Sequence, residues 1–122
     1  MILVDTSIWI DHLRESNSEL VELLKQFRVA AHPFVIGELA CGNLKNRRAI
    51  LHYLNTLRRV PIASNSEVLT FIERHTLMGR GIGYVDAHLL ASTALADAAT
   101  LWSKDKRLVK VASELNLAAP NN

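Results

Sequence analysis

This sequence has four carboxylates that could act together: Asp5, Glu38, Asp86 and Asp105. Each lies just after an expected strand or within an expected helix. Asp5 directly follows the apolar run 2–4, and Asp105 follows the apolar stretch 100–103. An aspartate between a strand and a helix is often a simple helix cap, and acids near a helix start are favoured by its dipole. Asp5, Asp86 and Asp105 each have such an ordinary explanation when taken alone.

Glu38 differs from the other three because its neighbours, residues 34–41, are apolar or small. A lone carboxylate that is buried costs several kcal/mol unless it is paired or binds a metal ion. The alternative is a glutamate that projects to solvent from a half-exposed helix. The sequence leaves both explanations of Glu38 open.

The four carboxylates have a common chemical meaning if they converge. Two carboxylates roughly 4 Å apart repel by about 4 kcal/mol at an effective dielectric near 20, so such a cluster keeps its charge only beside a cation. Cys41 is the only cysteine, which excludes a thiolate cluster, and oxygen ligands suit Mg²⁺ or Mn²⁺. These ions serve phosphate chemistry, because they polarise phosphoryl oxygens and lower the pKa of a bound water. The sequence does not fix whether one ion or two would bind.

The size and composition predict one globular domain covering residues 1–122. The chain is 49% hydrophobic and 21% charged, which is typical of a folded rather than a disordered protein. No apolar run reaches the roughly 18 residues that a membrane helix needs, and no basic segment precedes the first apolar run. With a single cysteine and no targeting signal, we expect a cytoplasmic protein without membrane association.

The charge balance changes when the four carboxylates are set apart. The formal net charge is +2, but without those four residues 8 acidic side chains face 14 basic ones, a balance of +6. A basic body around an acidic cluster suits a polyanionic substrate drawn to a cation-filled pocket. The alternative is that +2 is an ordinary solubility charge.

Short apolar runs alternate with amphipathic segments along the chain. Branched or apolar runs predict strands over residues 2–4, 28–32, 60–62 and 100–103. Helical spacing and capping residues, including a capping box at Ser64 and Glu67, predict helices over residues 6–14, 18–27, 34–40, 46–57, 64–77, 84–96 and 105–115. This alternation predicts an α/β fold with a short parallel sheet and helices on both faces. In such sheets sites form beyond the carboxyl ends of strands, where Asp5 and Asp105 fall.

The four acidic residues lie in four short segments whose sequences and order can be compared with those of known families. The segments are residues 1–10 (MILVDTSIWI), 36–39 (IGEL), 81–92 (GIGYVDAHLLAS) and 101–108 (LWSKDKRL). Together they resemble PIN-domain proteins, and more specifically the VapC toxins of bacterial and archaeal VapBC toxin–antitoxin pairs. The four segments follow the family's order and span nearly the whole chain.

The resemblance implies a PIN-like three-layer sandwich and a Mg²⁺- or Mn²⁺-dependent endoribonuclease that hydrolyses phosphodiester bonds in RNA. It also implies the toxin of a type II toxin–antitoxin pair, neutralised by a VapB-type antitoxin that often inserts a basic side chain into the acidic pocket. Members of the family usually form homodimers, so a homodimer is expected here.

The resemblance also assigns roles to residues. Asp5 and Asp86 would be the main metal ligands, and Glu38 would complete the shell or contact it through a water molecule. Asp105 would orient the attacking water or bind a second ion. Ser7 and Ser103 match hydroxyl positions beside the acids and are assigned to substrate binding. Basic residues near the acids are candidates for phosphate contact, with a solvated surface charge as the alternative: Arg80, Lys104, Lys106, Arg107 and Lys110.

Other polar and aromatic residues have simpler interpretations. His12 and His88 are set aside as general bases, because neither shares a helical face with an acid of the cluster. Trp9 and Trp102 are interpreted as core or dimer residues, with base stacking a minor alternative.

Three rival functions are compatible with an acidic pocket. A non-catalytic PIN-like module that binds RNA or a partner would be indicated by an incomplete acidic set, and here the set is complete. A phospho-acceptor signalling domain needs an acid after its central strand, but residues 63–65 contain none. A Mg²⁺-dependent phosphatase would want an aspartate two residues after Asp5, where this chain has Ser7.

Overall fold

Four short parallel strands form the centre of the molecule in the computed structural model, which describes all of residues 1–122. The strands are β1 (Ile2–Val4), β2 (Val29–Ala31), β3 (Arg58–Arg59) and β4 (Thr100–Trp102), in the spatial order β3-β2-β1-β4. Every neighbouring pair is parallel. The predicted α/β fold with a short parallel sheet is confirmed.

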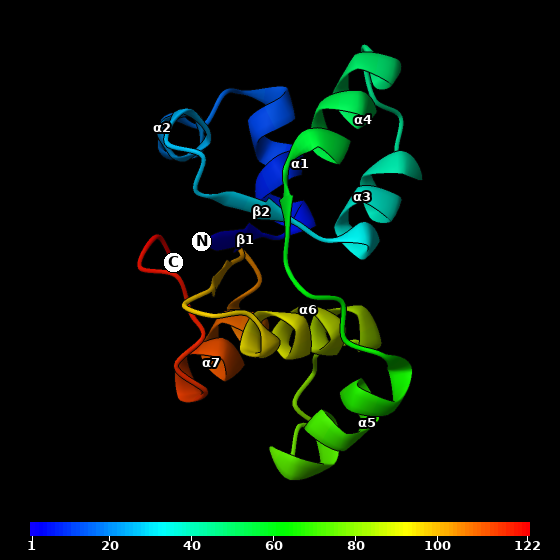
Figure 1. Cartoon of the computed structure of the whole chain (residues 1–122), viewed down its shortest axis with the longest axis vertical. Coiled ribbons are helices and arrows are strands. Elements are labelled where there is room, and N and C mark those ends of the chain that lie inside the picture. The colour runs from blue at the N-terminus through cyan, green and yellow to red at the C-terminus, as the bar shows by residue number, and fades with distance from the viewer.

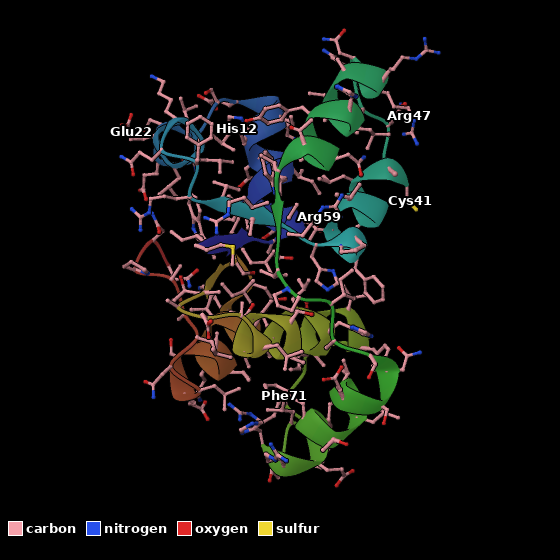
Figure 2. All side chains as sticks on the ribbon, viewed as in Figure 1. His12, Glu22, Cys41, Arg47, Arg59 and Phe71 are labelled. Carbon is pink, nitrogen blue, oxygen red and sulfur yellow. The ribbon has the colours of Figure 1, made fainter.

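Seven helices cover both faces of this sheet (Figure 1). One side carries α1 (Thr6–Arg14), α2 (Ser18–Lys25), α3 (Pro33–Ala40) and α4 (Arg47–Thr56). The other side carries α5 (Asn65–Arg74), α6 (Tyr84–Leu95) and α7 (Lys106–Glu114). Charged side chains on the outer surfaces of the helices, such as Glu22 and Arg47, point outward (Figure 2). The predicted three-layer arrangement is confirmed, and none of the helices combines the length and apolarity needed to cross a membrane.

The central strand β1 determines which loops meet at the carboxyl edge of the sheet. Val4 at its end pairs with Trp102 at the end of β4, and the Asp5 backbone N–H continues the ladder by donating to the Trp102 carbonyl at 2.9 Å. Carboxyl ends of parallel strands share one edge, so the residues after β1 and β4 are neighbours. Because β1 and β4 end at this common edge, Asp5 lies directly beside the loop that leads into α7.

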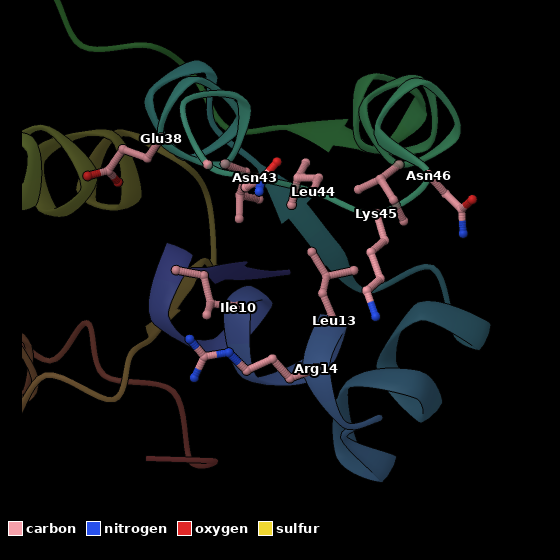
Figure 3. A pocket seen from close by; sticks show the side chains of 11 residues that line it. Ile10, Leu13, Arg14, Glu38, Asn43, Leu44, Lys45 and Asn46 are labelled. Atoms are coloured by element: carbon pink, nitrogen blue, oxygen red, sulfur yellow. The ribbon is translucent and has the colours of Figure 1, made fainter.

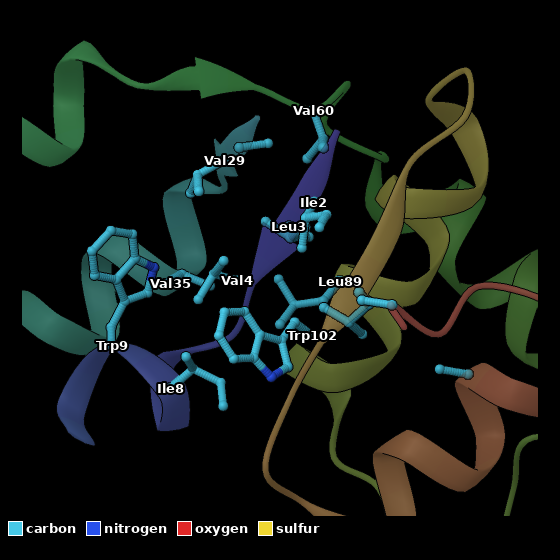
Figure 4. Close-up of a cluster of buried hydrophobic side chains, with 14 of the residues drawn as sticks. Ile2, Leu3, Val4, Ile8, Trp9, Val29, Val35, Val60, Leu89 and Trp102 are labelled. Atoms are coloured by element: carbon cyan, nitrogen blue, oxygen red, sulfur yellow. The ribbon is translucent and has the colours of Figure 1, made fainter. Parts of the chain in front are cut away.

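The hydrophobic core lies on both faces of the sheet. Trp9 and Trp102 are 2% and 5% exposed and pack on either side of β1, together with Ile8 and Leu89 (Figure 4). Helix α6 is the most enclosed helix, with every residue from 87 to 93 buried, because the sheet covers one side and α5 the other. Each large apolar side chain buried in this way contributes roughly 1.5–3 kcal/mol. Both tryptophans were interpreted as core or dimer residues, and the structure places both in the core.

The strand predicted over residues 60–62 is wrong in position. The structure places β3 at Arg58–Arg59, and Val60 is buried in the core just after the strand. Pro61 has no backbone N–H, so the ladder cannot continue through it. The apolar character of Val60 reflects burial in the core rather than membership of a strand.

Two helices end earlier than their apolar patterns predict. Helix α2 stops at Lys25 because Phe27 adopts a positive φ of 55°, and Arg28 N–H then bonds the Leu23 carbonyl. Helix α5 ends at Arg74 in the same way, since Thr76 has φ 53°. Left-handed C-terminal caps are usually made by glycine, so side-chain patterns give no warning of these two.

Candidate active site at the carboxyl edge of the sheet

Asp5 is the most enclosed carboxylate of the four, with 7% of its surface exposed. One oxygen, Oδ1, accepts the Thr6 backbone N–H at 2.8 Å and so caps α1. The other, Oδ2, accepts two hydroxyl protons, from Ser7 at 3.1 Å and from Ser103 at 2.8 Å. Asp5 is therefore fixed in position by both loops that leave the carboxyl edge of the sheet.

Ser103 connects Asp5 to the last carboxylate of the set. Its Oγ donates to Asp5 and accepts the backbone N–H of Asp105 at 3.0 Å. The neighbouring Lys104 N–H donates to Ser7 Oγ at 3.1 Å, which joins the two loops a second time. Both serines were predicted to contact substrate, and the structure places both hydroxyls on the Asp5 carboxylate.

Asp105 is exposed and caps α7. Its Oδ1 accepts the backbone N–H groups of Arg107 at 2.9 Å and Leu108 at 3.2 Å, while Oδ2 has no partner within the protein. The cap fixes the direction of the side chain and leaves one oxygen facing outward.

Glu38 is exposed on α3, so the hypothesis that it is buried is wrong. The apolar residues around it divide between the two sides of the helix: Val35 and Leu39 are buried, and Glu38 lies on the opposite, open side. Its Oε1 accepts the hydroxyl of Thr6 at 2.7 Å, which ties α3 to the start of α1. Glu38 therefore differs from an ordinary surface glutamate because it lies near the other acids, and not because it is buried.

Asp86 is half-buried in the first turn of α6, where its Oδ2 accepts the Gly83 backbone N–H at 3.1 Å. Burial raises the pKa of Asp86, and the Gly83 hydrogen bond partly opposes that rise. The charges of Asp5, Asp105 and Glu38 raise the pKa further. Asp86 is therefore close enough to the three other acids for their charges to affect its pKa. The structure places all four predicted carboxylates at one edge of the sheet.

The chemistry of this acidic cluster fits a hard divalent cation. None of the four carboxylates forms an ion pair with a lysine, arginine or histidine, so their charge is uncompensated within the chain. Three oxygens have no protein donor: Glu38 Oε2, Asp86 Oδ1 and Asp105 Oδ2. The side chains do not stand as a finished coordination shell, since no three of them are gathered closely enough to hold an ion. Uncompensated carboxylates repel one another, so a cation is required to draw them into such a shell.

The basic residues near the cluster fall into two groups. Arg80 pairs with Glu114, and Lys104 pairs with Asp11, so their charges are already matched on the surface. Lys106 and Arg107 lie in the first turn of α7 and form no ion pair. The Arg107 side chain lies directly against the backbone of Gly81, where an added Cβ would meet Arg107 Cδ at 2.8 Å.

A cleft of about 740 Å³ opens beside the acidic cluster, between α1, α3 and the start of α4 (Figure 3). Ile10, Leu13 and Leu44 contribute apolar lining, and Arg14 and Lys45 lie at its rim. Glu38 is the only carboxylate of the four that reaches it, from a helix shared by both features. The cleft and the acidic cluster are therefore neighbours and not a single pocket.

Sequence reasoning missed two polar contacts that shape the site. Thr6 carries the hydroxyl that holds Glu38, and its position next to Asp5 is the one signal that would have suggested it. Asn122 brackets β4, accepting the Ser103 N–H at 2.9 Å and donating to the Leu101 carbonyl at 2.8 Å. No local pattern points to that second contact.

The PIN-domain family model matches residues 2–114, and the parallel sheet with helices on both faces agrees with that fold. The chain belongs to the PIN-domain family. It is also 48% identical over 118 residues to proteins named Ribonuclease VapC32 from two strains of Mycobacterium tuberculosis, CDC 1551 and H37Rv. That similarity covers 97% of this chain and 95% of each relative.

Proposed function

We propose that this protein is the toxin of a type II toxin–antitoxin pair, a Mg²⁺- or Mn²⁺-dependent endoribonuclease that acts on cytoplasmic RNA. A ribonuclease of the VapC kind is supported by membership of the PIN-domain family and by the similarity to Ribonuclease VapC32 along nearly the whole chain. The observation that carries the site is that four carboxylates lie at one edge of the sheet and none of them forms an ion pair. In agreement with this, burial and the charges of Asp5, Asp105 and Glu38 raise the pKa of Asp86.

Asp5, Glu38, Asp86 and Asp105 would hold the divalent cation. A cation bound there would polarise the scissile phosphodiester and lower the pKa of a water molecule. Asp5 presents a fixed carboxylate because Ser7 and Ser103 donate to it, and Asp86 keeps one oxygen free while the other accepts the Gly83 N–H. The two serines thus position a ligand, and a contact of either hydroxyl with the substrate would come in addition to that role.

The exposed members of the cluster face the RNA. Asp105 has a free oxygen and a direction set by its cap on α7, which suits it to orient a water molecule toward the phosphate. Lys106 and Arg107 follow in the same turn without ion pairs, so they are the strongest candidates for phosphate contact. Arg80 and Lys104 would first have to leave Glu114 and Asp11, and we assign them weaker contacts.

A VapB-type antitoxin is proposed to neutralise the enzyme. The cleft beside Glu38 offers apolar side chains next to an uncompensated acidic cluster, which suits a segment with apolar residues followed by a basic one. A homodimer is proposed as well, supported by the large apolar side chains left exposed on α5 and α6: Leu69, Tyr84 and Leu95. Sedimentation of the isolated chain tests the dimer, and loss of inhibition in Leu13→Glu tests the cleft.

The function is tested with purified, antitoxin-free protein incubated with total cellular RNA and Mn²⁺, Mg²⁺ or a chelator. Discrete fragments that require the metal and are lost in Asp86→Asn are expected. Intact RNA under every condition, from folded protein that binds no Mn²⁺, would support instead a non-catalytic module that binds RNA or a partner. Intact RNA from protein that does bind Mn²⁺ would indicate a narrow substrate range.

A further inference from the structure

A buried polar contact joins the two helices that carry Glu38 and Asp86. His32 and Ser92 are both 0% exposed, and His32 Nε2 lies 3.1 Å from Ser92 Oγ. His32 is the N-cap of α3, six residues before Glu38, and Ser92 lies on α6, six residues after Asp86. The contact therefore links α3 to α6 across the edge of the sheet.

The hydrogen-bond partners fix which ring nitrogen carries the proton. The Phe34 backbone N–H donates to His32 Nδ1 at 3.0 Å, so Nδ1 must be unprotonated. The proton is then on Nε2, which donates to Ser92 Oγ. Burial, followed by electrostatic repulsion from His88 of α6 and Arg59 of β3, lowers the pKa of His32 to about 4. The ring is neutral near pH 7 and holds one hydrogen bond to each helix.

The same serine ties in a third segment. Ser92 Oγ also accepts the Ala63 backbone N–H at 3.2 Å, just before the cap that starts α5. Asn65 of α5 in turn accepts the Tyr84 hydroxyl at 3.0 Å and contacts His88 Nε2 at 3.2 Å, at the two positions flanking Asp86 by two residues. The start of α5 is thus tied to α6 at two places, and α3 is tied to α6 at one of them.

We propose that the His32–Ser92 hydrogen bond is a positioning contact that sets Glu38 and Asp86 at the separation needed to share one divalent cation. This inference rests on the proposed function of the acidic cluster. Helix α3 has only eight residues and Glu38 lies about 9 Å along it from the cap, so a shift of its N-terminus moves the whole helix. Neither His32 nor Ser92 touches the cation site; both act through the helices.

Three variants separate positioning from general stability. Ser92→Ala removes the bond to His32, and with it the acceptor of the Ala63 N–H, but leaves the cap on α3. His32→Asn therefore has to reproduce its effect, because it leaves the Ala63 contact in place. His32→Asn keeps a good N-cap but is too short to reach α6. Thr93→Val is the matched control, because Thr93 is the next residue, is equally buried, and spends its hydroxyl on the Leu89 carbonyl of its own helix.

The readout is the dissociation constant of Mn²⁺ for the full chain without RNA, measured by calorimetry. Ser92→Ala and His32→Asn are each expected to weaken Mn²⁺ binding by about tenfold, the low end of the effects seen when a support of a metal ligand is lost. Thr93→Val should stay within about twofold of the unaltered protein, and the double variant should be no weaker than either single one. Unchanged Mn²⁺ affinity in Ser92→Ala and His32→Asn would overturn the proposal.

A second readout keeps the failure of the proposed function distinct. If the unaltered chain binds no Mn²⁺, the metal site itself is rejected. Amide hydrogen exchange in α3 then tests whether the His32–Ser92 hydrogen bond holds α3 against α6. Faster exchange of α3 in Ser92→Ala than in Thr93→Val would support a link between α3 and α6. Equal exchange in the two variants would reject it.

Discussion

The acidic cluster has two halves that are built differently. Asp5 and Asp105 follow neighbouring strands, and backbone pairing of β1 with β4 brings their loops together before any side chain contributes. Glu38 and Asp86 lie on helices of opposite layers, and their placement depends on side-chain contacts such as Thr6 to Glu38 and His32 to Ser92. We call these the strand half and the helix half.

The comparison indicates how precision and adjustment are divided within the site. In the strand half, the Asp5 carboxylate is buried and accepts three hydrogen bonds, so it has little freedom to move. In the helix half, Glu38 is exposed with a single protein donor, and Asp86 is half-buried with a raised pKa. Loss of a carboxylate should abolish function in either half, whereas loss of a supporting contact should cost more in the strand half.

The largest effect is expected for Asp5→Asn in the strand half. Asparagine keeps an oxygen to cap α1, so the fold should persist, while ribonuclease activity should fall on the order of 100-fold or more, as when one charged or polar group aimed at the transition state is lost. Fragment yield per unit time measures the activity, and circular dichroism checks the fold. An active Asp5→Asn protein would remove Asp5 from the site.

Acid is expected to loosen the helix half before the strand half. The pKa of His32 is about 4 in the folded protein against 6.5 for an ordinary histidine, so the unfolded chain takes up this proton first. The contribution of neutral His32 is complete above about pH 6.5 and is lost as the pH falls through about 4, on the order of 3 kcal/mol in all.

Chemical denaturation of the unaltered protein and of His32→Asn at pH 7 and pH 5 measures this contribution of His32 to the free energy of unfolding. The stability gap between pH 7 and pH 5 should shrink in His32→Asn, and amides at the start of α3 should lose protection at pH 5 before those of β1. An identical pH dependence in the two proteins would contradict the assignment to His32.

Removing a hydroxyl from each half should give unequal effects. Ser103→Ala leaves the buried Asp5 with one fewer donor, at a cost of about 1–3 kcal/mol in stability. Thr6→Val removes the donor to the exposed Glu38, where water replaces it, and should cost well under that. Thermal unfolding compares the two, and Ser103→Thr is the control that keeps the hydroxyl. Equal losses would mean that burial does not distinguish the halves.

A small effect on stability, of the opposite sign, is expected for Asp86→Asn. Burial and three neighbouring charges raise the pKa of Asp86, which means that the charged form is disfavoured in the folded protein. Asparagine removes the charge and keeps an acceptor for the Gly83 N–H, so stability in chelator at pH 7 should rise by about 1 kcal/mol. A lower unfolding midpoint in Asp86→Asn would show that repulsion between the four carboxylates does not destabilise the folded protein.

Local interactions explain why so much of the fold and site could be predicted from the sequence. The caps at Asp5 and Asp105 and the capping box of Ser64 and Glu67 act within three residues, so their sequence signatures are short and direct. Parallel strands must end at a common edge, and this rule placed Asp5 and Asp105 together in advance. Errors arose where backbone conformation alone decides, at the left-handed Phe27 and Thr76 and at the strand before Pro61.

The sequence by itself determined the order of the elements, the identity of the acids and the strand half of the site. Only the tertiary structure decided that Glu38 is exposed, that Thr6 holds it, and that His32 reaches Ser92 sixty residues away. The physical reason is that hydrophobic periodicity shows which face of a helix is buried but not the helix against which it packs. That choice depends on how the buried side chains of the whole chain fit together.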